Sequence, residues 1–285
     1  MSVVLITGCS SGFGLETALA FARRGDTTYA TMRNLAKADR LLERARAEDL
    51  AVELLTLDVT DDASVLSAVQ EIEARHGAID VLVNNAGVGF DGPVETIDLD
   101  AARAVLETNF WGPVRLIRAA LPAMRAQGAG VIVNVTSVAG RVPGNGYMCW
   151  YGASKHAMNA LSEGLVMELD GLGVRVACIE PGFFQTDIMQ NAGVGDNQPG
   201  PYAAEHAWMI DFYDKSVAGS GDPSSVADAI VAAATDPDTP LHNLVGDDAK
   251  GYVDLFDQAG TLEAWLPIGI SIVETVAGPR PVKGT

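Results

Sequence analysis

The sequence has 285 residues, of which 48% are hydrophobic, and a formal net charge of −18 at pH 7. This length and apolar content suit a single domain spanning residues 1–285, with ample material for a core. The acidity excludes a basic surface for nucleic acid, and no run of about 20 apolar residues predicts a membrane span.

Short apolar runs alternate with helical patterns through the first 180 residues. The runs are continuously apolar, which is typical of strands buried on both faces of a sheet. The alternation predicts an α/β fold, a doubly wound Rossmann-type parallel sheet of about seven strands with helices on both faces. The expected strands cover residues 3–6, 27–31, 52–57, 79–83, 131–135, 174–179 and 241–245.

The segments between these strands have helical patterns. Asp61 is expected to cap one helix, and a long helical region is expected to bend near Gly112-Pro113. The expected helices cover residues 15–24, 35–48, 61–75, 99–126, 151–169, 202–217 and a segment after Pro223.

A glycine turn with the spacing G-x-x-x-G-x-G follows the first strand. Glycines allow close backbone approach to a ligand, and the free N–H groups of the next helix favour a pyrophosphate. A tight turn also needs glycine, but this position in a βαβ unit favours phosphate binding. The residues expected to hold the cofactor here are Gly8, Ser10, Ser11, Gly12, Phe13 and Gly14.

The residues after the second strand indicate which dinucleotide is bound. An acid there would bind a ribose 2′-OH, whereas an arginine would accept a 2′-phosphate. The sequence has no acid in Ala30–Asn34 and places Arg33 at this point, with the hydroxyl of Ser11 in the glycine turn to assist. We therefore expect NADP(H) to be preferred over NAD(H), although an arginine at a helix start can be an ordinary surface residue.

Tyr151 and Lys155 stand four residues apart at the start of a predicted helix. This spacing puts both side chains on one helix face. An ammonium at that distance would lower the pKa of the phenol from its usual value of about 10. A tyrosine of this kind can give or take a proton during a reaction, although such pairs are often only neighbours on a solvated helix.

Five ordered motifs together resemble the short-chain dehydrogenase/reductase family over about residues 2–187. Residues 29–34 and 137–140 are most similar to its 17β-hydroxysteroid and retinol dehydrogenase-like branch. The motifs are Thr7-Gly8-x-x-x-Gly12-x-Gly14, Asn84-Asn85-Ala86-Gly87, Ser137, Tyr151-x-x-x-Lys155 and Pro181-Gly182.

The resemblance implies roles for the matching positions. Ser137 would hydrogen-bond the substrate oxygen, Asn109 would hold a water that leads protons to Lys155, and Lys155 would also bind the ribose. Further cofactor contacts are implied for Asp58 and Val59 at the adenine, for Asn85, Ala86 and Gly87 at the adenosine ribose, and for Pro181, Gly182 and Thr186 at the nicotinamide.

The chain departs from the family pattern in two places. Fourteen positions separate Ser137 from Tyr151, one more than is usual, so the loop 141–150 contains an extra residue. Ser11 stands where many NADP-preferring relatives have Arg or Lys, so Arg33 would act without a second cation.

The segment 183–222 is expected to form a lid over the substrate, because it combines aromatic residues with Met189, Gly193 and Gly195. Few cations lie in this part of the chain, so the pattern favours a bulky, lipophilic ketone or secondary alcohol over a charged substrate. The residues expected to line the pocket are Met148, Phe183, Phe184, Trp208 and Phe212.

These observations favour an oxidoreductase that transfers a hydride between NADP(H) and a lipophilic carbonyl compound. A dinucleotide-binding redox sensor without catalysis and a sugar-nucleotide epimerase are the alternatives. The three scattered cysteines predict free thiols and a cytoplasmic protein, and the four histidines show no metal-ligand spacing. By analogy with the family, a homodimer or homotetramer is expected.

Overall fold

The computed structural model describes residues 1–144, 146–188 and 199–282. Seven parallel strands form one sheet in the order β3-β2-β1-β4-β5-β6-β7, which confirms the predicted doubly wound fold. The predicted strand ends agree with the structure to within two residues. The strands are β1 Val3–Ile6, β2 Thr27–Met32, β3 Glu53–Thr56, β4 Val81–Asn84, β5 Gly130–Val135, β6 Val174–Pro181 and β7 His242–Val245.

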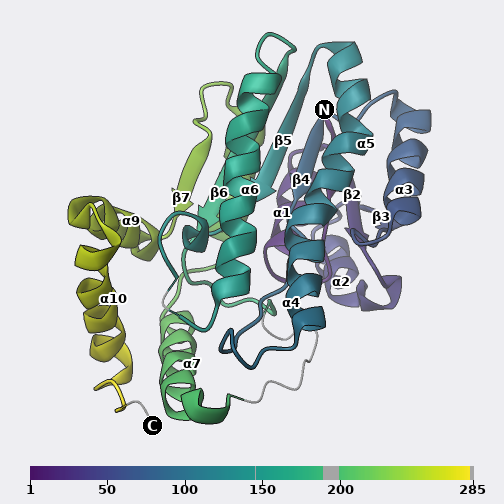
Figure 1. Cartoon of the computed structure of the whole chain (residues 1–285). Helices are drawn as coiled ribbons and strands as arrows, with labels where there is room; N and C mark the ends of the chain where they lie inside the picture. The colour runs from purple at the N-terminus through teal and green to yellow at the C-terminus, as the bar shows by residue number, and fades with distance from the viewer. Residues whose placement is uncertain (145, 189–198, 283–285) are drawn as a thin grey trace.

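Helices cover both faces of the sheet (Figure 1). The helices around the sheet are α1 Gly12–Arg23, α2 Asp39–Ala47, α3 Asp62–His76, α4 Leu99–Leu106, α5 Gly112–Gln127, α6 Cys149–Glu168 and α8 Ser224–Thr235. Asp61 caps α3 as predicted, since its carboxylate accepts the N–H groups of Ala63 at 2.8 Å and Ser64 at 3.3 Å.

The strands supply two separate hydrophobic cores because successive side chains point to opposite faces. In β1, Val4 and Ile6 join the core beneath α1 and α8, whereas Leu5 joins the core beneath α3, α5 and α6. In β5, Val133 joins the first of these cores and Ile132 joins the second. This two-sided burial explains why β1 is apolar throughout, whereas the edge strands β3 and β7 are only partly buried and contain polar residues.

The long helical region 99–126 is interrupted by a π-helical turn, Glu107–Trp111. The bend therefore comes just before the predicted Gly112-Pro113. A π turn inserts one residue into the helix and commonly marks a functional position. Here it turns Asn109 inward, where the side chain is 2% exposed.

Three helices beyond the sheet complete the described chain. Helix α7, Ala203–Ala218, confirms the predicted helix 202–217, whereas α9, Asp247–Ala259, and α10, Leu262–Ala277, were not predicted. Helices α9 and α10 lie beyond β7, and α10 packs on α7 through Val273, Met209 and Phe212 (Figure 1). No helix in the described ranges is long and apolar enough to cross a bilayer.

The loop between α6 and β6 makes the packing testable. Gly173 has φ +76, and a Cβ there would overlap the carbonyl oxygen of Gly128 at the end of α5. Gly171 has φ +75 with open space around it. We expect Gly171→Ala to lower the free energy of unfolding by about 1 kcal/mol and Gly173→Ala by about 2–4 kcal/mol, measured by urea unfolding. Equal losses would show that the overlap has no effect.

Candidate active site

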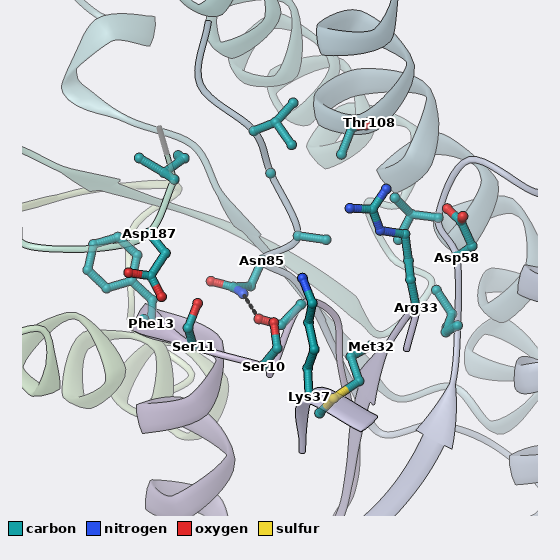
Figure 2. Close-up of a pocket in the computed structure, with 18 of the residues that line it drawn as sticks. Ser10, Ser11, Phe13, Met32, Arg33, Lys37, Asp58, Asn85, Thr108 and Asp187 are labelled. Carbon is teal, nitrogen blue, oxygen red and sulfur yellow. Dashed lines mark hydrogen bonds between the residues drawn. The ribbon is translucent and has the colours of Figure 1, made fainter. Parts of the chain in front are cut away.

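A groove of about 330 Å³ lies at the carboxyl ends of β1 to β4 (Figure 2). Such an edge, where the strand order reverses between β1 and β4, is where doubly wound sheets bind ligands. The predicted cofactor residues that line the groove are Gly8, Ser10, Ser11, Gly12, Phe13, Arg33, Asp58, Val59, Asn85, Ala86, Gly87 and Thr186.

The glycines of the turn are required by its geometry. Gly8 and Gly12 have φ +74 and φ +55, in the left-handed region. Gly14 lies beneath the turn, where a Cβ would contact the carbonyl of Gly8 and the side chain of Asn85. Helix α1 begins with no side-chain cap and no acid in its first turn. Its first N–H groups therefore remain available for an anion.

Asn85 and Thr7 hold this turn against β4. The Asn85 amide donates to the Thr7 carbonyl at 2.7 Å, and the Thr7 hydroxyl accepts the N–H groups of Asn85 and Ala86 at 3.0 and 2.9 Å. Asn85 was expected to line the adenosine ribose. The residue borders the groove, but its side-chain amide bonds to the backbone of the glycine turn.

Two cations, Arg33 and Lys37, project into the groove from the end of β2 (Figure 2). Asn34 caps the short 3-10 turn Leu35–Lys37 by accepting the N–H of Ala36 at 3.0 Å. This turn brings Lys37 back toward the groove, so a second cation lies in the groove with Arg33, whereas the sequence had indicated Arg33 alone. Lys37 follows Arg33 by four residues, and this spacing could have indicated that both cations lie at the same groove.

A second cleft, of about 190 Å³, adjoins the groove. It shares the lining residues Phe13, Asn85, Gly87, Thr186 and Ile188 with the groove and contains Ser137, Tyr151, Lys155, Pro181 and Gly182. The structure therefore brings Ser137, Tyr151, Lys155 and the predicted nicotinamide residues to one end of the groove.

Ser137 and Tyr151 meet in this cleft. The Ser137 hydroxyl accepts the N–H of Ala139 at 3.1 Å, lies 3.5 Å from the carbonyl oxygen of Pro181, and is close enough to the phenol of Tyr151 to lower its pKa. The extra residue in the loop 141–150 therefore leaves Ser137 within reach of the phenol. A hydroxyl and a phenol converging on one point can together bind a carbonyl oxygen.

Lys155 is 4% exposed and lies on the same face of α6 as Tyr151. Its ammonium donates to the Val135 carbonyl at 2.9 Å and stands 5.5 Å from the centre of the tyrosine ring. Burial lowers the pKa of Lys155 to about 8. Like the phenol, the ammonium has been withdrawn from water, which disfavours its charged form.

The predicted lowering of the pKa of Tyr151 is not found. Burial raises the pKa of the phenol, and the hydrogen bond from Ser137 offsets this in part. The physical reason is that Lys155 faces the carbonyl of Val135 and the ring of Tyr151, while the surroundings of the phenol are apolar. At neutral pH this phenol therefore carries its proton.

Asn109 fixes the loop after β4. Its amide oxygen accepts the N–H of Val88 at 2.8 Å, and its amide nitrogen donates to the Val88 carbonyl at 2.9 Å and to the Ser154 hydroxyl at 3.1 Å. Asn109 thereby connects that loop to α6, beside Lys155. Its predicted role in holding a water stays a prediction.

The predicted wall of the pocket is partly wrong. Met148, Phe183 and Phe184 line the cleft, but Phe212 is 1% exposed and packs behind Phe183, while Trp208 lines a separate cavity beside α10. Both side chains point toward α10, which was not predicted from the sequence. The cleft residues that the sequence did not indicate include Ile188, Val217 and Tyr252. Met189, Gly193 and Gly195 lie outside the described residues.

Helix α9 holds the segment that follows β6. The N–H of Phe183 donates to the carboxylate of Asp248 at 2.6 Å, and a Cβ on Gly182 would overlap that carboxylate. Gly182 is thus required by a close contact with a part of the chain for which the sequence had given no prediction.

Comparisons with known proteins agree with this geometry. The short chain dehydrogenase family profile matches residues 2–197. The chain belongs to this family. It is an oxidoreductase of the type that acts on alcohol or carbonyl groups, as the resemblance had implied.

Individual relatives cover most of this family member. The uncharacterized oxidoreductase YusZ of Bacillus subtilis is 36% identical, over 82% of this chain and 84% of that protein. Human 17-beta-hydroxysteroid dehydrogenase type 1 is 41% identical, over 66% of this chain and 58% of that one. A short-chain dehydrogenase from Streptomyces avermitilis has the same fold, with a TM-score of 0.80, 35% identity and coverage of 94% and 97% of the two chains.

The low pKa of Lys155 predicts a particular pH dependence of stability. Its pKa is about 8 in the folded chain and 10.5 when unperturbed. Between these values the unfolded chain binds more protons, so the free energy of unfolding should rise with pH, by up to about 1.4 kcal/mol per unit. Below pH 8 both the folded and the unfolded chain bind this proton, so Lys155 no longer makes the free energy of unfolding depend on pH. The raised pKa of Tyr151 acts in the opposite direction only above pH 10.

The measurement is urea unfolding of the wild-type chain and of Lys155→Met between pH 7 and 10, about the window that the two pKa values of Lys155 define. Relative to the variant, the wild type should gain stability as the pH rises above 8. Parallel curves over this window would show that Lys155 keeps an ordinary pKa in the folded chain.

Proposed function

We infer that this oxidoreductase transfers a hydride between NADP(H) and a lipophilic ketone or secondary alcohol. One observation carries the inference: the pair Ser137 and Tyr151, with Lys155 beside it, lines an apolar cleft where that cleft joins the glycine-turn groove. An oxygen bound by the pair would thus sit at the end of a bound dinucleotide.

The residues present fit a nicotinamide dinucleotide. The uncapped start of α1 and the glycine turn suit its pyrophosphate, because Gly8 and Gly12 bring backbone close to the ligand. Pro181, Gly182 and Thr186 would border the nicotinamide end, and Asp58 and Val59 the adenine end. When bound, this cofactor supplies the hydride.

The residues of the chain act on the oxygen. Ser137 orients the carbonyl oxygen, and as the carbonyl carbon receives the hydride, Tyr151 donates its proton to that oxygen. A phenol whose pKa is raised by burial is protonated at neutral pH, which is the form needed for reduction. The ammonium of Lys155 then stabilises the phenolate, and Asn109 would hold the water that reprotonates the pair.

Arg33 and Lys37 support a preference for NADP(H). Both side chains line the groove where the 2′-phosphate would lie, and no acid is present in Ala30–Asn34 to bind a 2′-OH. We expect the Michaelis constant for NADPH to be at least about tenfold below that for NADH, since a charge-assisted contact contributes about 1.5–3 kcal/mol.

The variants Arg33→Gln and Lys37→Gln should each raise the Michaelis constant for NADPH without changing the Michaelis constant for NADH. Arg40→Gln is the matched control, because Arg40 is exposed on α2 and does not line the groove. Equal Michaelis constants of the wild-type enzyme for NADPH and NADH would refute the preference.

The cleft predicts which carbonyl compounds are reduced. Lys155 is the one charged side chain among the described residues that line it, and the wall is formed largely by apolar groups such as Met148, Phe183 and Phe184. NADPH consumption should be measured over steroid, retinoid, aromatic and aliphatic ketones and over small keto acids. Bulky apolar ketones should have a kcat/KM at least about tenfold above that of the keto acids. Activity confined to keto acids would contradict a lipophilic substrate.

A further inference from the structure

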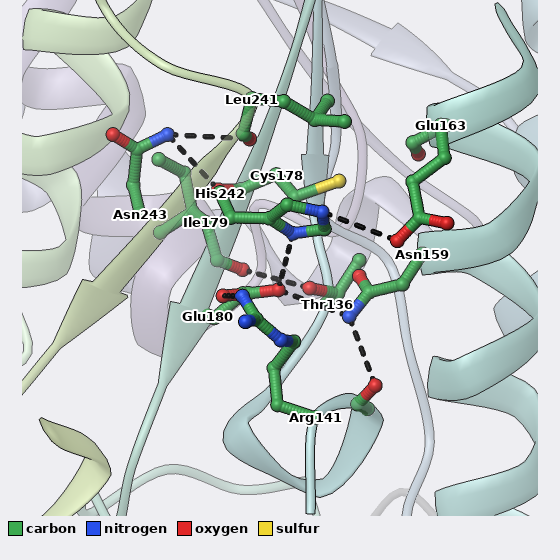
Figure 3. Close-up of polar contacts among 12 residues, drawn as sticks. Thr136, Arg141, Asn159, Glu163, Cys178, Ile179, Glu180, Leu241, His242 and Asn243 are labelled. Atoms are coloured by element: carbon green, nitrogen blue, oxygen red, sulfur yellow. Dashed lines mark hydrogen bonds and ion pairs between the residues drawn. The ribbon is translucent and has the colours of Figure 1, made fainter. Parts of the chain in front are cut away.

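A fully buried carboxylate, Glu180, lies near the end of β6, immediately before Pro181 (Figure 3). Withdrawing a carboxylate from water costs free energy unless donors surround it. The position therefore needs an explanation beyond filling space, since an apolar side chain would fill it at no such cost.

Three donors from three parts of the fold converge on this carboxylate. One oxygen accepts the amide N–H of Asn159 on α6 at 2.9 Å and the Nδ1–H of His242 on β7 at 2.8 Å. The other accepts from the guanidinium of Arg141 at 3.1 Å, in the loop that follows β5. Glu180 thus joins α6, β7 and this loop to β6 (Figure 3).

Two of these contacts lead directly to the proposed catalytic residues. The 3-10 turn Val138–Gly140 is capped by Ser137 and is followed by Arg141. Asn159 lies one helical turn beyond Lys155, and its amide nitrogen also donates to the Gly140 carbonyl at 3.1 Å. The same amide thus connects the end of the serine turn to Glu180.

The serine turn lies tightly against α6. A Cβ on Gly140 would come within 2.9 Å of the side-chain nitrogen of Asn159 and of the Lys155 carbonyl oxygen. The amide of Asn159 faces two acceptors, so its own oxygen has no partner in the described protein. This unpaired oxygen is a local cost, which is consistent with a position selected for geometry over stability.

We propose that Glu180 is a positioning residue for the reaction proposed above. Through Arg141 and Asn159 it fixes the serine turn against the helix that carries Tyr151 and Lys155. Through its place in β6 it fixes both against Pro181, whose carbonyl faces the Ser137 hydroxyl. A shift of the turn would separate Ser137 from the phenol while leaving the cofactor groove intact.

The test is Glu180→Gln, which keeps the shape of the side chain. The carboxylate has two oxygens that accept from three donors, whereas the amide has only one oxygen to accept them. We expect kcat for ketone reduction to fall about 10- to 100-fold, while the Kd for NADPH changes less than about threefold. Deuterium at C4 of NADPH should slow the variant more than the wild type, because a misplaced proton donor makes the chemical step limiting.

Glu163→Gln is the matched control. Glu163 lies 3.2 Å from the Nε2 of His242 on the outer side, with 58% of its side chain exposed, so the same change there leaves the Glu180 contacts in place. This variant should retain the wild-type kcat and isotope effect. A Glu180→Gln enzyme that also retains both would overturn the proposal.

If Glu180→Gln does not fold, the same measurements are made on Arg141→Met and Asn159→Ser. Each should lower kcat and raise the isotope effect in the same way, and unchanged kinetics in both would overturn the proposal. If the wild-type enzyme reduces no ketone with NADPH, the proposed function fails and this proposal fails with it. Activity in the wild type with no effect at Glu180 removes only the positioning role.

Discussion

The hydrogen bonds between Thr7 and Asn85 hold the ends of β1 and β4 together at the point where the strand order reverses. The other parts of the site are arranged around this junction. The glycine turn lies on one side of it, with Gly14 packed against the Asn85 side chain, and the loop held by Asn109 lies on the other. The groove and the cleft therefore share part of their lining there, including Asn85 and Gly87.

Withdrawal from water sets the chemistry of the cleft. It raises the pKa of Tyr151 and lowers that of Lys155, so each group is pushed toward its neutral form. With a pKa of about 8, Lys155 still carries its charge at neutral pH, beside a phenol that keeps its proton. The hydroxyl of Ser137 offsets the rise in the pKa of the phenol only in part.

Local signals made the parts nearest the strands predictable. The apolar runs, the glycine spacing and the pair Tyr151 and Lys155 each act within one element and its turn, and the structure places them together. Contacts between distant segments were not predictable. Trp208 faces α10, and Asp248 reaches Gly182 from a helix that has no motif. The predicted direction of the pKa shift of Tyr151 was wrong, because the helical spacing of Tyr151 and Lys155 does not indicate how deeply the phenol is buried.

The central claim is that the phenol of Tyr151 protonates the oxygen that receives the hydride. The most direct measurement compares single turnovers of the wild type and Tyr151→Phe with NADPH and a bulky ketone, together with the Kd for NADPH. The rate of the variant should fall by about 10²–10⁴ with NADPH binding nearly unchanged, because the ring remains and only the proton donor is lost. A variant that reduces the ketone at the wild-type rate would contradict the account.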